Sequence, residues 1–357
     1  MTGRQFIAPT RYVQGPDVLG TAAEAFGVLE GARAALIGGR TAMATAGAPL
    51  RESLSGAGID VVASRDGEDA CTRARIEACV GTVRAADADV VVGVGGGVAL
   101  DLATATAHGT GAECVAVPTI ASTDAPCSTV SVVYDEAGNF VDAVERDRNP
   151  ELVVVDSRIV AAAPARFLRH GMGDAIATRF EAEGCLAAGA EVHAGGRSSH
   201  AAVAIARECY DRIADHGADA LAAARRDAVT PAFERVVEAN VLLSGLGFES
   251  GGTAGAHAVQ IGLTNGAGVR RPHGELVAFG TVVELVLADR TDALAAVVEL
   301  CDELELAATL DGLGVDDDQL PAVGAEACTS GMEREPFEVT PAAVADAVRT
   351  ADELLAG

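Results

Sequence analysis

The chain has 357 residues, 49% of them hydrophobic but only 3% aromatic, and its 52 acidic and 26 basic side chains give a formal net charge of −26. So negative a chain is disfavoured as a partner of nucleic acid or of anionic membranes. Every basic residue is arginine. A GC-rich genome would explain the missing lysine but not the excess of acid, which favours a halophilic protein adapted to concentrated salt.

The eight cysteines are scattered along the chain without a C-x-x-C pair. The opening residues, MTGRQFIAPTRYVQG, lack the apolar core of a signal sequence, and no segment is long and apolar enough to span a bilayer. Because this cysteine usage suits a reducing compartment rather than a disulfide framework, we expect a cytoplasmic protein.

Short apolar runs alternate with helical patterns in the first part of the chain. Strands separated by helices predict a parallel sheet that is covered on both faces. A hairpin is expected over 128–144, with its turn at 136–139. In chain order, the other predicted elements are a strand over 34–39, a helix over 41–57, a strand over 59–64, a helix through Val83, a strand over 89–92, a helix from Ala99, and strands over 113–119 and 152–156.

From about Pro164 the pattern changes to long helices rich in Ala, Leu and Glu, without a convincing strand. A proline suits the first turn of a new helix. The sequence therefore predicts two domains, an α/β domain over 1–162 and an all-helical domain over 163–357.

Two segments of the α/β part carry the marks of a ligand site. In GVGGG (93–97), glycines join a strand to a helix, an arrangement in which backbone N–H groups and the helix dipole can meet a phosphate. A tight, closely packed turn is the alternative. The segment PTIASTDAPCSTVSVVY (118–134) is rich in Ser and Thr directly after a strand, where parallel sheets bind ligands, although a plain loop would have a similar composition.

These two segments resemble the glycerol dehydrogenases of the iron-containing (type III) alcohol dehydrogenase superfamily. The resemblance continues through NPELVVVDSRIVAAAPARFLRHGMGDAIATRFEAEGC, TPAFERVVEAN, SGLGFESGGTAGAHAV and HGELVAFGT, and so covers most of the chain. It implies a dehydroquinate synthase-like fold, in which a Rossmann-like parallel-sheet domain that binds a dinucleotide precedes an all-α catalytic domain that binds a metal ion. Relatives form homo-oligomers, often octamers, and the resemblance implies an oligomer here too.

The family's metal ligands match Asp174 in GMGDAIAT, His257 in AGAHAV and His273 in RPHGE. Taken alone, these residues would be interpreted as an N-cap aspartate, a core histidine and a loop histidine. The resemblance implies instead a site of one carboxylate and two imidazoles with an open position for substrate. Thr178 stands where many iron-type relatives have a fourth ligand, so zinc is favoured over iron.

The resemblance also implies the reaction, the oxidation of a polyol and most simply of glycerol to dihydroxyacetone. In such a reaction a metal ion stabilises the deprotonated hydroxyl, and hydride passes to C4 of a nicotinamide. Asp124 matches the family's substrate-contacting aspartate and would accept a hydrogen bond from a second hydroxyl, although it could also cap the turn at Ala125–Pro126. The catalytic residues implied are Asp124, Asp174, His257 and His273.

Two departures from the family bear on the cofactor. Relatives have a lysine after three glycines where this chain has Val98, so the pyrophosphate is left to the N–H groups of Gly96 and Gly97. NAD-using relatives have an aspartate in place of Gly39, which Arg40 follows here; this predicts that NADP is accepted beside NAD or preferred to it, unless Arg40 is merely solvated. The cofactor-binding residues that the resemblance implies are Gly39, Arg40, Gly96, Gly97, Val98, Asp101, Thr119, Ser122, Ser128, Val130 and Tyr134.

Arg270 and Arg271 precede the second metal histidine, where relatives often carry aromatic residues or histidine. They indicate either a solvated loop or a site for a phosphate or carboxylate. The second case would make the protein a glycerol-1-phosphate dehydrogenase-like enzyme that reduces a phosphorylated or acidic ketone. Gln260 replaces a histidine of several relatives and, with Val98, leaves open a catalytically silent binding or scaffold member of the family.

Overall fold

The computed structural model describes residues 3–29, 31–136, 138 and 140–357. The chain divides into two compact units. The α/β unit comprises Ala8–Phe167 and Ala222–Leu242, and the helical unit comprises Met1–Ile7, Leu168–Leu221 and Leu243–Gly357. The chain thus leaves the α/β unit a few residues after 162, and residues 222–242 return to that unit, a crossing that the helical pattern of the sequence does not reveal.

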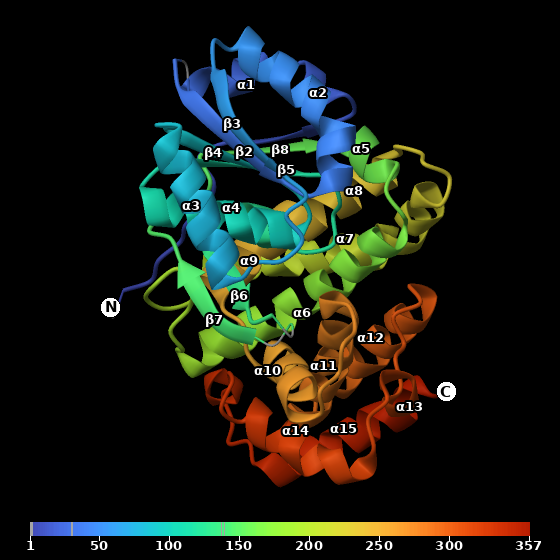
Figure 1. Cartoon of the computed structure of the whole chain (residues 1–357). Coiled ribbons are helices and arrows are strands. Elements are labelled where there is room, and N and C mark those ends of the chain that lie inside the picture. The colour runs from blue at the N-terminus through green and yellow to red at the C-terminus, as the bar shows by residue number, and fades with distance from the viewer. Residues whose placement is uncertain (1–2, 30, 137, 139) are drawn as a thin grey trace. The chain divides into compact units, whose positions relative to one another are not determined.

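The α/β unit is built on a six-stranded sheet in the order β1-β8-β5-β4-β2-β3 (Figure 1). All neighbouring strands in it run parallel, as predicted. The strands are β1 (Tyr12–Gly15), β2 (Arg33–Gly38), β3 (Asp60–Asp66), β4 (Val90–Gly95), β5 (Glu113–Pro118) and β8 (Leu152–Asp156). The sequence did not predict β1, because this four-residue edge strand is only partly buried and lacks an apolar run.

Both faces of the sheet are buried because helices cover each of them. Successive side chains of a strand point to opposite faces, so each strand contributes to two cores. On one face, Leu36, Val92 and Val115 pack in a core with α1 (Ala23–Phe26) and α2 (Arg40–Gly56). On the other face, Ile37 and Val91 pack with α3 (Arg73–Ala85) and α4 (Gly97–Thr110). The near-continuous apolar runs of the strands are therefore explained by burial on two sides.

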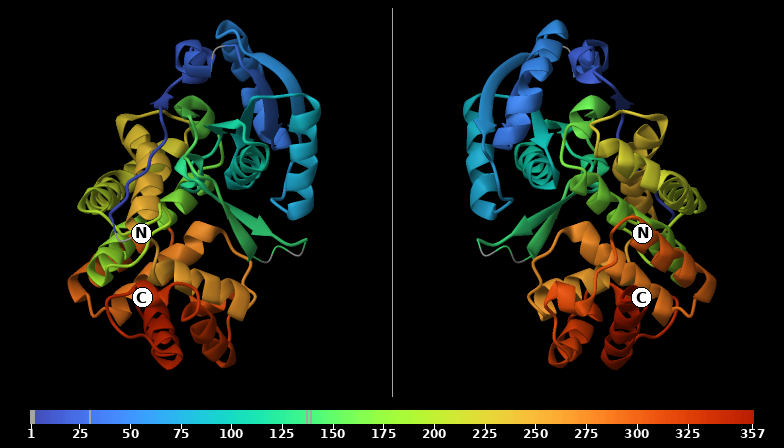
Figure 2. Two further views of the ribbon diagram at one scale, coloured as in Figure 1. Left: turned by 90° about the vertical axis from the view of Figure 1, so that its left-hand side faces the viewer. Right: turned by 90° about the vertical axis from the view of Figure 1, so that its right-hand side faces the viewer.

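The predicted hairpin is present as the antiparallel pair β6 (Val130–Tyr134) and β7 (Phe140–Glu145). Figure 2 shows these two green strands as a ribbon that extends away from the main sheet of the same unit. In the predicted turn at 136–139, Ala137 and Asn139 lie outside the described residues.

The remaining part of the α/β unit includes α5 (Ser157–Ala161), which follows β8, and α8 (Pro231–Glu238). Glu234 of α8 accepts hydrogen bonds from the Gln14 side chain of β1 and from Ser157. These contacts explain why residues 222–242 belong to the unit that holds the sheet. Its shorter helices are η1 (Val18–Gly20), η2 (Gly27–Leu29), η3 (Ala125–Cys127) and the π-helical turn η4 (Ala239–Leu243).

The second half of the chain is helical, as predicted, and its described residues form no strand, only isolated β-bridges. Two helices begin at a Thr-Pro pair, where the threonine side chain caps the helix and the proline stands in its first turn: Thr230 for α8 and Thr340 for α15. Figure 2 shows the C-terminal helices side by side in orange and red. The helices of this part are α6 (Arg166–Ala188), α7 (His200–Ala224), α9 (Ser244–Gly251), α10 (Gly255–Ile261), the π-helical turn η5 (Gly262–Gly266), α11 (His273–Leu287), α12 (Thr291–Glu303), α13 (Leu310–Leu313), η6 (Asp317–Gln319), α14 (Leu320–Ala327), η7 (Met332–Arg334) and α15 (Pro341–Leu355).

A membrane-spanning segment was not expected, and among the described residues no helix combines the length and the apolar character that crossing a bilayer requires.

Candidate functional site

The glycine run GVGGG forms the junction between β4 and α4. Gly95 has φ +150°, and a Cβ on Gly96 would lie 2.5 Å from Cδ1 of Ile120, so close packing of the turn accounts for part of the run. Gly96 is the N-cap of α4 and Gly97 its first residue. Val98, where relatives have lysine, is 39% exposed. The turn therefore combines tight packing with a helix N-terminus, and neither interpretation of the run excludes the other.

Three predicted cofactor residues follow neighbouring strands at the same edge of the sheet. Gly39 follows β2, Gly96 follows β4 and Thr119 follows β5. These strands are adjacent and parallel, and Gly95 lies in register with Pro118. This edge is the carboxyl end of the strands, where open parallel sheets bind their ligands.

Arg40, the first residue of α2, is exposed. Among the described residues its guanidinium takes part in none of the ion pairs of the α/β unit. Gly39 before it has φ −68° and ψ 150°, which any residue can adopt. A Cβ there would have Glu68 O, at 3.7 Å, as its nearest neighbour. There is thus room for a larger group at Gly39, and the exposed guanidinium of Arg40 lies next to it in the chain.

The other predicted cofactor residues lie in α4, in the loop after β5 and in β6. Ser122 is half-buried, and Ser128 Oγ accepts the N–H of Val130 at 2.8 Å. Tyr134 ends β6, and burial together with Asp101 raises the pKa of its hydroxyl to about 12. Burial also raises the pKa of Asp101 to about 8, against the opposing hydrogen bond from the Val132 backbone. Asp101 is thus packed inside the unit, between α4 and β6.

Asp124 precedes the short helix η3, and its backbone carbonyl accepts the N–H of Cys127. Within this described segment its carboxylate makes no capping hydrogen bond to η3. Asp124 is thus the N-cap residue of the turn at Ala125–Pro126 through its backbone carbonyl, without a side-chain cap.

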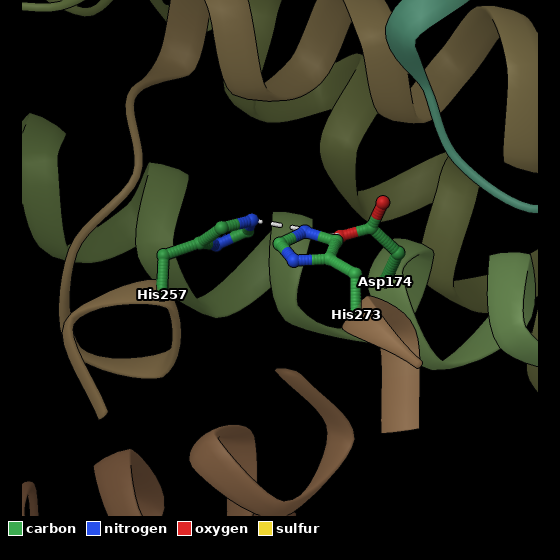
Figure 3. Close-up of side chains that lie close together, drawn as sticks. All are labelled: Asp174, His257 and His273. Atoms are coloured by element: carbon green, nitrogen blue, oxygen red, sulfur yellow. Dashed lines mark ion pairs between the residues drawn. The ribbon is translucent and has the colours of Figure 1, made fainter. Parts of the chain in front are cut away.

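In the helical unit, Asp174, His257 and His273 come together from three helices (Figure 3). One ligand atom from each lies within 4.8 Å of the others. Asp174 Oδ1 is 3.5 Å from His257 Nε2 and 3.3 Å from His273 Nε2. The ring centroids of the two histidines are 5.4 Å apart. Residues separated by almost a hundred positions in the sequence therefore present one oxygen and two nitrogens to one point.

The crossing of α6 and α11 places two of these ligands. Gly173 and Gly274 stand next to Asp174 and His273, and they let the two helices approach within backbone contact. A Cβ on Gly274 would collide with the carbonyl oxygen of His170. Asp174 lies well inside α6, so the interpretation of this residue as an N-cap is wrong. His257 lies in the first turn of α10, and His273 is the first residue of α11 rather than a loop residue.

The charges of the group favour a cation between its members. Asp174 is 2% exposed, and among the described residues neither of its carboxylate oxygens has a hydrogen-bond partner. Burial raises the pKa of Asp174, but His273 and His257 outweigh it and hold the pKa well below its usual range. A buried carboxylate without hydrogen bonds is costly unless a cation satisfies it. One carboxylate and two imidazoles are a donor set that suits zinc, so the residues present fit a metal ion.

A second carboxylate touches this group, and sequence analysis did not single it out. Glu181 Oε2 lies 2.7 Å from His257 Nδ1. Burial lowers the pKa of His257, but Glu181 and Asp174 outweigh it and raise the pKa well above its ordinary value. Glu181 follows Asp174 by two turns of the same helix, and this spacing of two acids on a buried face of α6 was the signal that could have identified it.

Two positions near the group differ from the family, and both side chains make hydrogen bonds. Thr178, one turn after Asp174, is buried with its hydroxyl 2.9 Å from that of Ser244, so no fourth ligand stands there. The Gln260 amide donates to the hydroxyl of Thr264.

The two arginines before His273 contact neighbouring segments of the chain, from η5 to the first turn of α11. Arg270 donates to the carbonyl oxygens of Thr264 and Val269, and Arg271 pairs with Glu275 at 2.6 Å. These contacts favour a structural role in the loop over a site for a phosphate or carboxylate group.

Known proteins share this fold and align with this chain over nearly its whole length. A family model described as iron-containing alcohol dehydrogenase matches residues 9–157. A glycolaldehyde reductase of Halobacterium salinarum is 42% identical and aligns over 98% of this chain and 97% of its own. A glycerol dehydrogenase of Escherichia coli is 40% identical over 97% of this chain and 96% of its own. The crystal structure of a glycerol dehydrogenase from Schizosaccharomyces pombe matches with a TM-score of 0.94 at 32% identity, over 100% of this chain and 92% of the other. The chain therefore belongs to the iron-containing alcohol dehydrogenase family and is an oxidoreductase of the alcohol dehydrogenase type.

Proposed function

We propose that this protein is a metal-dependent, NAD(P)-linked polyol dehydrogenase that interconverts glycerol and dihydroxyacetone. The observation that carries the proposal is the group of Asp174, His257 and His273, in which a buried carboxylate without a hydrogen-bond partner among the described residues faces two imidazoles. Its second support is the similarity of the whole chain to glycerol dehydrogenases.

In this proposal the three residues hold a zinc ion. The donor set suits zinc, and the hydrogen-bonded Thr178 supplies no further ligand of the kind found in iron-type relatives. A metal ion bound here supplies Lewis-acid stabilisation of negative charge on the substrate oxygen. Asp174 provides the anionic ligand, and Asp124 accepts a hydrogen bond from a further substrate hydroxyl, which favours a polyol over a simple alcohol.

The cofactor in this proposal binds at the carboxyl edge of the sheet, along Gly39, Gly96 and Thr119. Since Gly39 offers no carboxylate for a ribose 2′-hydroxyl and Arg40 is exposed, NADP is accepted and preferred to NAD. Val98 adds no charge to the pyrophosphate site, so backbone N–H groups at the start of α4 carry that contact.

The test is glycerol oxidation by zinc-loaded protein in molar KCl, with NAD and NADP side by side. Removal of the metal with a chelator should abolish turnover, and added Zn²⁺ should restore it. Asp174→Asn should lower kcat/KM by at least about a hundredfold, because Lewis-acid stabilisation is worth several kcal/mol. His200 is an exposed histidine at the start of α7, and its variant His200→Gln is the control, which should behave like wild type. Turnover that is indifferent to the chelator would contradict the proposal.

A second candidate is the reduction of glycolaldehyde, because a relative of that name is 42% identical to this chain. Both substrates place a hydroxyl beside the reacting carbon, so the same metal group and Asp124 could serve either. The two are separated by comparing kcat/KM for dihydroxyacetone and glycolaldehyde with the same reduced cofactor. A preference of tenfold or more for glycolaldehyde, about 1.4 kcal/mol in transition-state binding, would replace the first assignment by the second.

A further inference from the structure

The start of α10, which carries His257, is surrounded by buried carboxylates. The first N–H groups of a helix have no partner within it and need acceptors from elsewhere. Here, four consecutive N–H groups each donate to a carboxylate from another part of the helical unit. The donors are Ala254, Gly255, Ala256 and His257, and their acceptors are Glu181, Glu335, Glu284 and again Glu181, at 2.7, 2.9, 3.0 and 2.9 Å.

Glu181 differs from the other two carboxylates because it also touches a side chain of the candidate metal group. Its Oε1 accepts both backbone N–H groups, and its Oε2 lies 2.7 Å from Nδ1 of His257. The residue is 0% exposed. Glu284 and Glu335, by contrast, reach the backbone of α10 at Ala256 and Gly255.

The chemistry of these contacts defines the state of the imidazole. Carboxylate oxygens accept hydrogen bonds, so the contact of 2.7 Å from Glu181 Oε2 to Nδ1 favours the ring form that carries its hydrogen on Nδ1. The lone pair of a neutral ring is then on Nε2, the nitrogen that lies 3.5 Å from Asp174 Oδ1. A metal ion needs that lone pair, and a histidine that offers the other nitrogen could not serve at this position.

We infer that Glu181 is a positioning residue for the metal centre, whose carboxylate fixes His257 in the Nδ1–H form with Nε2 directed at Asp174. The inference rests on the proposed function in that it presupposes a metal ion at the group. A carboxylate behind a ligating histidine orients the ring and raises its basicity, and losing it typically lowers metal affinity 10- to 100-fold.

The test compares Zn²⁺ affinity of wild type and Glu181→Gln, measured on the metal-free full chain by competition with a chromophoric chelator. The glutamine side chain has an oxygen that accepts hydrogen bonds and an NH₂ group that donates them. In one orientation the NH₂ group faces Nδ1–H of His257, and in the other it faces the two backbone N–H groups. Each arrangement sets donor against donor. We expect the variant to bind Zn²⁺ 10- to 100-fold more weakly than wild type.

Glu284→Gln is the matched control, because it is a buried carboxylate of the same cluster whose contact with α10 an amide oxygen can replace. It should bind Zn²⁺ with nearly wild-type affinity. Equal affinity of wild type and Glu181→Gln would overturn the inference while leaving the proposed function intact. Equal weakening in both variants would also overturn it, since the cluster would then act through the backbone. If wild type itself bound no Zn²⁺, the proposed function would fail first.

A second measurement needs no variant of Glu181 and decides the matter if Glu181→Gln does not fold. Zinc-loaded wild type labelled with ¹⁵N-histidine shows by its ring couplings which nitrogen of each histidine carries hydrogen. The signals of His257 are assigned by their absence in His257→Gln. We expect hydrogen on Nδ1 of His257, and hydrogen on Nε2 would overturn the inference.

Discussion

At the scale of single residues, Gly39 is the position on which the proposed preference for NADP depends. Gly39→Asp fits the site, because the backbone there has φ −68° and the nearest atom to a Cβ is 3.7 Å away. The new carboxylate would repel a 2′-phosphate and accept a ribose 2′-hydroxyl. We expect kcat/KM with NADP to fall about tenfold, since unit charges repel by on the order of 1 kcal/mol at an exposed site, and the value with NAD to rise.

Gly39→Asn separates charge from size at this position, because it has the same shape without the negative charge. It should lose much less activity with NADP than Gly39→Asp does. Similar losses in the two variants would show that bulk, and not repulsion of a phosphate, limits binding at Gly39.

Single residues also differ in how far the sequence could predict their roles. Asp174, His257 and His273 were identified because they match motifs of a known family, and the structure brings their side chains together. Glu181 belongs to the same motif as Asp174, yet its role depends on which ring it meets, and that ring comes from α10. A contact between residues so far apart in sequence cannot be inferred from the spacing of either segment alone.

At the scale of elements, the carboxylates around the start of α10 make stability depend on pH. Burial raises the pKa of Glu335 from 4.5 to about 7, with the N–H of Gly255 opposing the rise and Glu181 adding to it. The folded state therefore binds this proton more tightly than the unfolded state does. The contribution of protonated Glu335 to the free energy of unfolding is fully present below about pH 4.5. It is lost as the pH rises to about 7, by roughly 3 kcal/mol in total.

Glu335→Gln removes this dependence, because an amide oxygen can still accept the N–H of Gly255 without becoming charged. We expect urea unfolding to show the variant to be more stable than wild type at pH 8 and nearly equal to it at pH 5. An equal difference at both pH values would mean that packing, and not ionisation of Glu335, causes the change.

The strands and helices of the α/β unit were largely predictable from the sequence, whereas the segments with which they pair were not. Runs such as Val90–Gly95 are apolar because both faces of the strand are buried, so composition reveals them. Tyr12–Gly15 forms the edge strand β1 by pairing with β8, and its four mostly half-buried residues are too short a run to predict a strand by themselves. Likewise, Arg270 and Arg271 gain their roles from contacts outside their own dipeptide, Arg270 with carbonyl oxygens before it and Arg271 with Glu275 in the first turn of α11.

At the scale of the whole molecule, the net charge of −26 is the property with the widest consequence. Repulsion among so many carboxylates destabilises a compact chain at low salt. We expect the Tm to rise between about 0.1 and about 1 M KCl, over which the Debye length falls from about 10 to about 3 Å. Choline chloride at the same ionic strength should give a similar rise if screening is the cause. A Tm that is flat or falls with salt would contradict adaptation to concentrated salt.

The fold class, the family and the types of residue in the candidate metal group could all be predicted from the amino-acid sequence. These follow from local patterns, namely apolar strands, helical stretches rich in Ala, Leu and Glu, and contiguous motifs, each of which is complete within a short segment. Packing of the folded chain, in contrast, places residues 222–242 with the sheet, Asp174 inside a helix, and Glu181 against the ring of His257. Those features depend on helix crossings such as that at Gly173 and Gly274, where close backbone contact between distant segments sets which side chains meet.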